Sequence, residues 1–251
     1  MLTASFNEMA DQLAQARAAE QSFLLSVSHE LKTPLTAIRG YAEGLEEGAV
    51  DPREAGEVMA QEGARLARLV QDLLDLAKLN QRAFAVRKEA VDLAAVAREA
   101  VMRYEPRARS FGVAVVAEVD ERGVAWGAGD ADRLHQVLSN LVENALRVTP
   151  VNGRIAVRAA PGLLSVSDTG PGIAPEDVPH AFERFYLSRR YRGERPVGTG
   201  LGLAIVKQLT EAMGGTVSVT SAPGTGTTFT LRLEVLPAPT RSSAAAPGRS
   251  R

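Results

Sequence analysis

The sequence predicts an α+β protein in which an antiparallel helical hairpin precedes an α/β sandwich. Three observations favour this fold class. Apolar residues recur with helical spacing through residues 1–80, and a glycine-to-proline break divides that stretch into two parts. From Val86 onward, short β-like runs alternate with helical patterns, which indicates helices packed on a sheet. The chain has 251 residues, a length that allows one or two domains, and 45% of them are hydrophobic, which is enough for a core.

The first helix is predicted from a seam of residues spaced alternately three and four apart, which is typical of coiled-coil a and d positions. One position of the seam is polar. Its members are Phe6, Met9, Leu13, Ala16, Glu20, Phe23 and Val27. The pattern continues less strictly as far as Leu45, so a long helix is expected.

The second helix is predicted after a short break. Gly48 is a helix-stop residue, Asp51 is a candidate N-cap, and Pro52 suits the first turn of a helix. A second apolar seam follows at Met59, Leu66, Leu69, Leu73 and Leu76. Two helices alone bury little apolar surface, so we expect a homodimer whose hairpins form a four-helix bundle. The alternative is a single hairpin packed on the rest of its own chain.

The second domain is predicted from five β-like runs, at residues 113–119, 154–158, 163–167, 216–220 and 227–234. Helical patterns lie between them at residues 93–104, 130–146 and 201–213, and a long arginine-rich polar loop is expected between Phe182 and Gly198. Residues 237–251 have the low-complexity composition of a disordered tail.

Composition excludes several classes of function. The absence of cysteine excludes a disulfide framework, a thiolate metal site and a cysteine nucleophile. The net charge of −1 gives no general attraction to nucleic acid. No apolar run approaches the ~18 residues of a membrane span. The three histidines lie far apart in the sequence and have no metalloprotease spacing.

His29 is the strongest candidate nucleophile. With Val27 facing the seam, His29 lies about 200° around the helix and points to solvent. Glu30 is its neighbour, Thr33 lies one turn further on, and Pro34 is expected to bend the helix at this point. A lone exposed histidine is most often only solvated, but here a carboxylate, a hydroxyl and a proline converge on it. A neutral imidazole is a competent nucleophile near neutral pH, and a neighbouring carboxylate can take its proton.

Three further clusters are candidates for nucleotide contacts. Asn140, Asn144 and Arg147 share one stripe of a predicted helix, and amide oxygens are suitable ligands for Mg²⁺. Asp168 enters a glycine turn with Gly170 and Gly172. The run Gly198, Thr199, Gly200, Leu201 and Gly202 opens a helix, where backbone N–H groups can bind phosphate. Each cluster alone is more simply explained as polar surface or as an ordinary turn.

Taken together, the motifs resemble the catalytic core of a sensor histidine kinase of a two-component system. The resemblance covers residues 20–236. It rests on six blocks in the family's order, at residues 28–35 (SHELKTPL), 129–145, 168–172, 182–186, 198–203 and 224–229. It implies a dimerisation and histidine-phosphotransfer hairpin at residues 20–82 and an ATP-binding domain of the gyrase and Hsp90 type at residues 86–236. Residues 1–19 resemble the end of a HAMP signalling helix.

The resemblance also implies roles for the candidate residues. His29 would take the γ-phosphoryl group of ATP, Glu30 would be the general base, and Thr33 would orient a water for dephosphorylation of the partner. Asn144 would bind Mg²⁺, with Asn140 and Arg147 near the phosphates. Asp168 would recognise adenine, in a loop shaped by Gly170 and Gly172. The phosphates would be bordered by Gly198, Thr199, Gly200, Leu201 and Gly202.

The chain departs from the family's pattern at two places. Arg147 and Val148 stand where Lys-Tyr is frequent, so the charge is kept and an aromatic contact is lost. Leu187 stands where an arginine is frequent, and Arg192 is the predicted substitute for the contact to the γ-phosphate. The linker near residues 79–87 is the predicted hinge between the two domains.

The implied reaction is ATP-dependent autophosphorylation of His29, followed by transfer to an aspartate in the receiver domain of a response regulator. The chain is then the cytoplasmic portion of a cell-membrane receptor, itself soluble, whose sensor and transmembrane segments are absent here. Two alternatives stay open: an ATP-driven conformational machine of the gyrase and Hsp90 type, and a degenerate kinase that acts as a dimeric scaffold.

Overall fold

The computed structural model describes residues 2–79, 86–119, 125–194 and 198–238. The chain divides into two compact units. The hairpin unit comprises residues 1–84 and 180–205, and the sheet unit comprises residues 85–179 and 206–251. Most of the predicted hinge and the predicted disordered tail lie outside the described residues.

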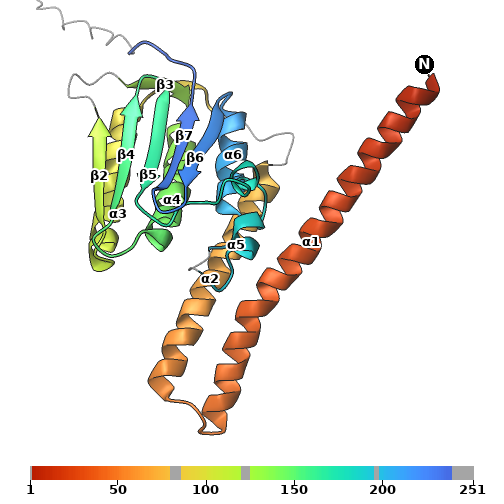
Figure 1. Ribbon diagram of the computed structural model, residues 1–251, viewed down its shortest axis with the longest axis vertical. Helices are drawn as coiled ribbons and strands as arrows, with labels where there is room; N and C mark the ends of the chain where they lie inside the picture. The colour runs from red at the N-terminus through yellow and green to blue at the C-terminus, as the bar shows by residue number, and fades with distance from the viewer. Residues whose placement is uncertain (1, 80–85, 120–124, 195–197, 239–251) are drawn as a thin grey trace, which may run out of the picture. The chain divides into compact units, whose positions relative to one another are not determined.

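The hairpin unit is built on two helices that run side by side, α1 (Leu2–Glu46) and α2 (Pro52–Leu79) (Figure 1). The turn between them has the predicted chemistry. Gly48 has a φ of 65°, in the left-handed region that glycine adopts without a Cβ penalty. The Asp51 Oδ1 atom accepts hydrogen bonds from the backbone N–H groups of Arg53 and Glu54, at 2.9 and 3.1 Å. The predicted N-cap of the second helix is therefore confirmed.

α1 continues without interruption through Pro34, which is buried, and through the predicted domain boundary after residue 19. Neither position ends a helix. The bend expected beside Pro34 and the boundary of the signalling helix both stay predictions.

The hairpin unit also contains residues 180–205, and one expectation for this stretch is wrong in part. The long loop predicted between Phe182 and Gly198 contains a short helix, α5 (Tyr186–Arg190). Phe185 precedes it with a φ of 62° and is fully buried, and its N–H donates to the Gly200 carbonyl at 2.8 Å. The Phe185 carbonyl accepts from Ser188 Oγ at 3.0 Å. This buried aromatic anchor fixes the turn that starts the helix, which the polar composition of the loop did not indicate.

The sheet unit contains a five-stranded sheet in the order β2-β4-β5-β7-β6. Its strands are β2 (Ala114–Val119), β4 (Arg154–Ala160), β5 (Leu163–Asp168), β6 (Thr216–Ala222) and β7 (Gly226–Arg232). All pairs are antiparallel except β2 with β4. The five predicted β-like runs are therefore confirmed as strands of one sheet.

Helices α3 (Leu93–Ser110) and α4 (Ala131–Val148) pack together and against this sheet (Figure 1). Ile155, Val157 and Leu164 are among the buried residues of the strands, and Leu134, Leu138 and Leu141 bury the apolar stripe of α4. This arrangement is the helix-on-sheet layer that the alternating pattern predicts. The third predicted helix is α6 (Gly202–Ala212).

Two features of the sheet unit were not predicted. Two short strands, β1 (Glu89–Asp92) and β3 (Trp126–Gly129), pair antiparallel in a small second sheet. α3 also continues past the expected end at residue 104 and passes through Pro106. The buried Tyr104 and Ala108 lie on either side of that proline, so packing holds the last turns of the helix.

Candidate functional site

His29 lies on α1 with its side chain exposed, as the helical spacing predicts. Its backbone carbonyl accepts a hydrogen bond from Thr33 Oγ1, at 3.1 Å. Thr33 is also exposed, so the imidazole and the hydroxyl are both accessible to another molecule. The structure therefore presents a solvent-facing imidazole within a regular helix.

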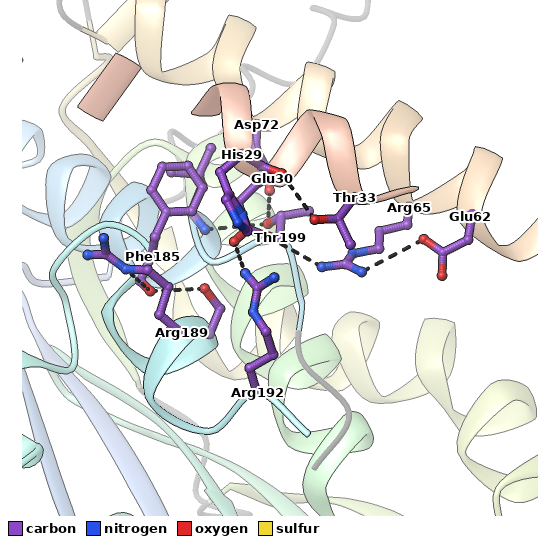
Figure 2. Close-up of polar contacts among 12 residues, drawn as sticks. His29, Glu30, Thr33, Glu62, Arg65, Asp72, Phe185, Arg189, Arg192 and Thr199 are labelled. Carbon is purple, nitrogen blue, oxygen red and sulfur yellow. Dashed lines mark hydrogen bonds and ion pairs between the residues drawn. The ribbon is translucent and has the colours of Figure 1, made fainter. Parts of the chain in front are cut away.

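Glu30, the next residue, is almost completely buried, with 3% of its surface exposed. Its Oε2 atom lies 3.4 Å from Nη2 of Arg65 on α2. Its Oε1 atom is paired with Nη2 of Arg192, which follows α5. Figure 2 shows the two guanidinium groups reaching Glu30 from different elements. A buried carboxylate needs such partners, because an unpaired charge away from water is costly.

Residues 184–194 and 198–199, which we call the lid segment, make further contacts with the hairpin (Figure 2). The ring of Phe185 stacks on that of Phe23 with centroids 6.1 Å apart, and Arg184 lies over the same Phe23 ring at 4.7 Å. Thr199 Oγ1 is hydrogen-bonded to Asp72 of α2. Two predicted phosphate-contacting residues, Arg192 and Thr199, thus meet acidic side chains of the hairpin.

The glycine run beside the lid segment has the backbone geometry expected of a close turn. Gly200 has a φ of 79°, and a Cβ at this position would lie 2.4 Å from Ser188 Oγ. Leu201 is buried, Gly198 is half-buried, and Gly202 is the first residue of α6. Only glycine fits at position 200, so this turn at the start of α6 is specified by the sequence.

In the sheet unit, Asn140 and Asn144 lie half-buried on α4. Within the described part of the chain, neither side-chain amide makes a hydrogen bond. Half-buried amides without a protein partner are free to bind a ligand or water. Asp130 caps this helix, accepting from the backbone N–H of Asp132 at 3.1 Å.

Arg147, the third residue predicted on this stripe, forms an ion pair with Glu143 of the same helix. Its Nη2 atom lies 3.4 Å from Oε2 of Glu143, one turn earlier. Glu143 also accepts from the Tyr104 hydroxyl of α3 at 3.4 Å and lies 3.7 Å from Nη1 of Arg107. Burial raises the pKa of Tyr104 above its ordinary value, so its hydroxyl stays protonated and donates to Glu143.

Asp168 is the last residue of β5 and is 5% exposed. Its Oδ1 atom accepts from the N–H of Gly170 at 2.8 Å, which closes the glycine turn. A Cβ on Gly170 would lie 3.0 Å from the Val148 carbonyl, so this turn lies against the C-terminal end of α4. The sheet unit therefore brings the carboxylate turn and the end of α4 together.

The remaining histidines are engaged in local contacts. His135 on α4 lies 3.1 Å from Glu99 of α3, and His180 lies 2.6 Å from Glu183 and stacks on Tyr186. Among the residues that the structure describes, no three histidine or acidic side chains gather where they could hold a metal ion. None of the helices in that same part of the chain combines the length and the apolar character of a membrane span.

Two protein-family models match the chain, one after the other. Residues 19–82 match the His Kinase A (phospho-acceptor) domain, and residues 129–237 match the family of histidine kinase-, DNA gyrase B- and HSP90-like ATPases. The chain belongs to the sensor histidine kinases. His29 lies within the residues that match the phospho-acceptor domain, and α4 with strands β4 to β7 lies within those that match the ATPase family.

Individual histidine kinases agree with this assignment. The sensor protein SrrB of Staphylococcus aureus is 37% identical over 222 residues, which are 85% of this chain and 38% of SrrB. The chain thus spans little more than a third of the length of the curated relatives it matches. The solved structure of the histidine kinase AdeS of Acinetobacter baumannii is similar with a TM-score of 0.65 and 26% identity, over 82% of this chain and 98% of AdeS. Full-length ShkA, solved in complex with AMPPNP, gives a TM-score of 0.62 and 33% identity, over 88% of this chain and 47% of ShkA.

Proposed function

We propose that the chain catalyses ATP-dependent autophosphorylation of His29. The observation that carries this proposal is the pairing of an exposed imidazole with an adjacent, buried carboxylate on α1, inside a phospho-acceptor domain. Family membership supports it, because an ATPase domain accompanies the acceptor histidine in the same chain.

In the proposed reaction, one ring nitrogen of neutral His29 attacks the γ-phosphorus of ATP with its lone pair. A P–N bond forms and the bond from the γ-phosphorus to the bridging oxygen breaks, its electron pair leaving with ADP. The proton of the other ring nitrogen passes to Glu30. Such transfers need little covalent help from the protein, so positioning and charge neutralisation dominate the rate enhancement.

We assign the nucleotide to the residues that the sequence predicts for it. Asp168 would recognise the adenine amino group, in the turn formed with Gly170 and Gly172. The phosphates would be bordered by Arg147, Arg192, Gly198, Thr199, Gly200, Leu201 and Gly202. The AMPPNP bound by ShkA, at 33% identity, supports an adenine nucleotide as the ligand.

Mg²⁺ is the proposed cofactor, held by the Asn144 amide with Asn140 beside it. The donor set fits this ion. The described residues offer no cage of acidic or histidine side chains, and Mg²⁺ prefers one or two hard oxygen ligands together with substrate phosphates and water. When bound, the ion neutralises charge on the phosphates. The protein's part is to aim the two half-buried amides of α4 at the ion.

The partners are also proposals. A receiver domain of a response regulator would take the phosphoryl group from His29 onto an aspartate. Thr33 would orient a water that hydrolyses the resulting phosphoaspartate and releases phosphate. A second copy of the chain would complete a four-helix bundle. From the likeness to sensor proteins, we also propose that the chain acts as the catalytic part of a membrane-bound sensor.

The test is incubation of the chain with Mg²⁺ and γ-labelled ATP, beside His29→Ala and, as a matched control, His135→Ala. We expect acid-labile, base-stable label in the wild type and in the control, and none in His29→Ala. Release of free phosphate without protein label would instead favour the gyrase-type ATPase machine. Neither label nor free phosphate, with nucleotide still bound, would favour the scaffold.

A further inference from the structure

Both oxygens of the buried Glu30 carboxylate contact an arginine, and the two arginines come from different parts of the hairpin unit. Arg65 binds Oε2 and comes from α2, which packs along α1 as the second arm of the hairpin. Arg192 binds Oε1 and comes from the lid segment, beyond the short α5. The two arginines therefore belong to elements with different structural roles.

The environment of Arg65 makes it the fixed partner. Its side chain is 21% exposed, against 36% for Arg192. Its Nη1 atom also lies 3.7 Å from Glu62, one turn earlier on α2. Arg65 is thus held between two carboxylates on the hairpin's own helices (Figure 2). An arginine fork in such a position keeps one carboxylate oxygen occupied and orients the other.

Arg192 has a competing anion in the proposed reaction. It is the lid arginine assigned to the γ-phosphate, so a bound triphosphate competes with Glu30 for its guanidinium group. When ATP takes Arg192, Oε1 of Glu30 loses its partner and becomes the oxygen that can receive a proton. Oε2 keeps its contact with Arg65, so one end of the carboxylate stays anchored on α2.

We propose that Arg65 is a positioning residue for the proton transfer from His29 to Glu30: it anchors Oε2 on α2 so that Oε1 accepts the imidazole proton once Arg192 has moved to the nucleotide. This inference rests on the proposed function, since it assumes that Glu30 is the base. It assigns a role to a residue of α2 that belongs to none of the sequence motifs.

The test is a double-mutant cycle on the full chain, with R65Q, E30Q and the double variant, and R68Q as the matched control. Arg68 lies on α2 three residues later and is exposed. The measured quantities are the autophosphorylation rate at saturating ATP, the KM for ATP and the affinity for AMPPNP. We expect R65Q to lower the rate about tenfold or more, with the KM and the AMPPNP affinity unchanged, and R68Q to match the wild type.

The decisive readout is the behaviour of R65Q in the E30Q background. If Arg65 acts through Glu30, the double variant is no slower than E30Q alone. A loss from R65Q that persists in the E30Q background, or a wild-type rate for R65Q, overturns the inference. The same cycle with R65K, which keeps the charge but not the fork, is expected to show a smaller loss with the same dependence on Glu30, and it answers the question if R65Q fails to fold.

The measured rates distinguish a failure of the Arg65 role from a failure of autophosphorylation itself. If the wild type takes up no acid-labile label, the proposed autophosphorylation itself fails. If the wild type is labelled but E30Q is as fast, Glu30 is not the base and the inference falls with that role. If E30Q is slow and R65Q is not, only the role of Arg65 is wrong.

Discussion

At the scale of single residues, His29 and Glu30 are sequence neighbours with opposite environments. Successive residues of a helix lie about 100° apart, so one points to solvent while the next faces α2. His29 is exposed and Glu30 is 3% exposed. This division suits a nucleophile that must meet a second domain and a base that must keep its orientation.

Thr33→Ala should separate two activities of the chain. Thr33 is exposed and its hydroxyl lies over the His29 carbonyl, so it can orient a water without contributing to the attack on ATP. We expect autophosphorylation to be retained and dephosphorylation of a phosphorylated receiver domain to fall about 10²-fold, since misplaced reactants lose that order of rate. Thr33→Ser, which keeps the hydroxyl, should behave like the wild type. Full phosphatase activity in Thr33→Ala would remove Thr33 from the reaction.

Tyr104 should make the stability of the sheet unit depend on pH in the alkaline range. Burial raises its pKa above 10.0, so the folded state holds the hydroxyl proton more tightly than the unfolded state. The resulting stabilisation is present below the unfolded pKa and is lost as the pH rises through the folded pKa. Between about pH 9 and about pH 11, the wild type should lose more free energy of unfolding than Tyr104→Phe.

The measurement for Tyr104 is urea unfolding followed by the fluorescence of Trp126, the only tryptophan in the chain, which lies on β3 of the sheet unit. At neutral pH, Tyr104→Phe should cost about 1 kcal/mol, because the hydroxyl's hydrogen bond to Glu143 is lost. Parallel pH curves for the two proteins would contradict the expected linkage.

At the scale of helices and strands, the sequence predicts well which elements exist and whether each is a helix or a strand, because apolar periodicity and capping residues are local signals. The Asp51 cap and all five strands of the main sheet follow the predicted pattern. The small β1–β3 sheet was missed because its strands have four residues each, too few to show alternation. The continuation of α3 past Pro106 depends on tertiary packing, which local propensity does not contain.

The candidate site likewise contains residues that local sequence motifs indicate and residues that only tertiary contacts bring in. His29, the amides of α4 and the glycine turns could be proposed from the sequence because each lies in a compact run of residues. Arg65 was not found, because its approach to Glu30 depends on the register between α1 and α2, which the turn at residues 47–51 sets. The stacking of Phe23, a predicted seam residue, on Phe185 likewise required the folded lid segment.

Gly172→Ala should be more destabilising than Gly224→Ala. Comparing the two variants separates the energetic cost of a steric clash from that of backbone strain. Both glycines have a φ of 76°, so alanine pays the same left-handed penalty of about 1–2 kcal/mol at either position. Only at Gly172 would the new Cβ also lie 2.0 Å from a carbonyl oxygen, that of Ala222, while Gly224 has open space. We expect an additional loss of about 1–3 kcal/mol for Gly172→Ala in urea unfolding followed by Trp126 fluorescence. Equal losses would show that the turn yields to accept the side chain.

At the scale of the whole molecule, the proposed reaction needs residues from both units. The proposed acceptor His29 lies in the hairpin unit, and Asn140, Asn144 and Asp168 lie in the sheet unit. A nucleotide held by the sheet unit must therefore meet an imidazole held elsewhere, on the same chain or on a partner. In the proposed homodimer, a second hairpin would offer a second His29 to that nucleotide.

The hairpin should dimerise through leucines that it leaves exposed. Leu25 is 72% exposed on α1, and Leu24, Leu35 and Leu74 are each at least half exposed on the same two helices. An unpartnered apolar surface of this kind marks an interface, and a second hairpin would cover it as a four-helix bundle. Leu25→Asp would place a carboxylate in that interface, and burying an unpaired charge costs several kcal/mol. We expect the dimer to weaken by about 10²-fold or more in Kd.

The matched control for Leu25→Asp is Met102→Asp, which makes the same change from an apolar to an acidic side chain at a residue that is also 72% exposed, on α3 of the sheet unit. In sedimentation equilibrium, the wild type and Met102→Asp should be dimers at concentrations where Leu25→Asp is a monomer. Because a monomer with intact units can still bind nucleotide, Leu25→Asp should keep its affinity for AMPPNP. A loss of dimer in both variants would point to a general effect of added charge, and a dimeric Leu25→Asp would place the interface on another face of the hairpin.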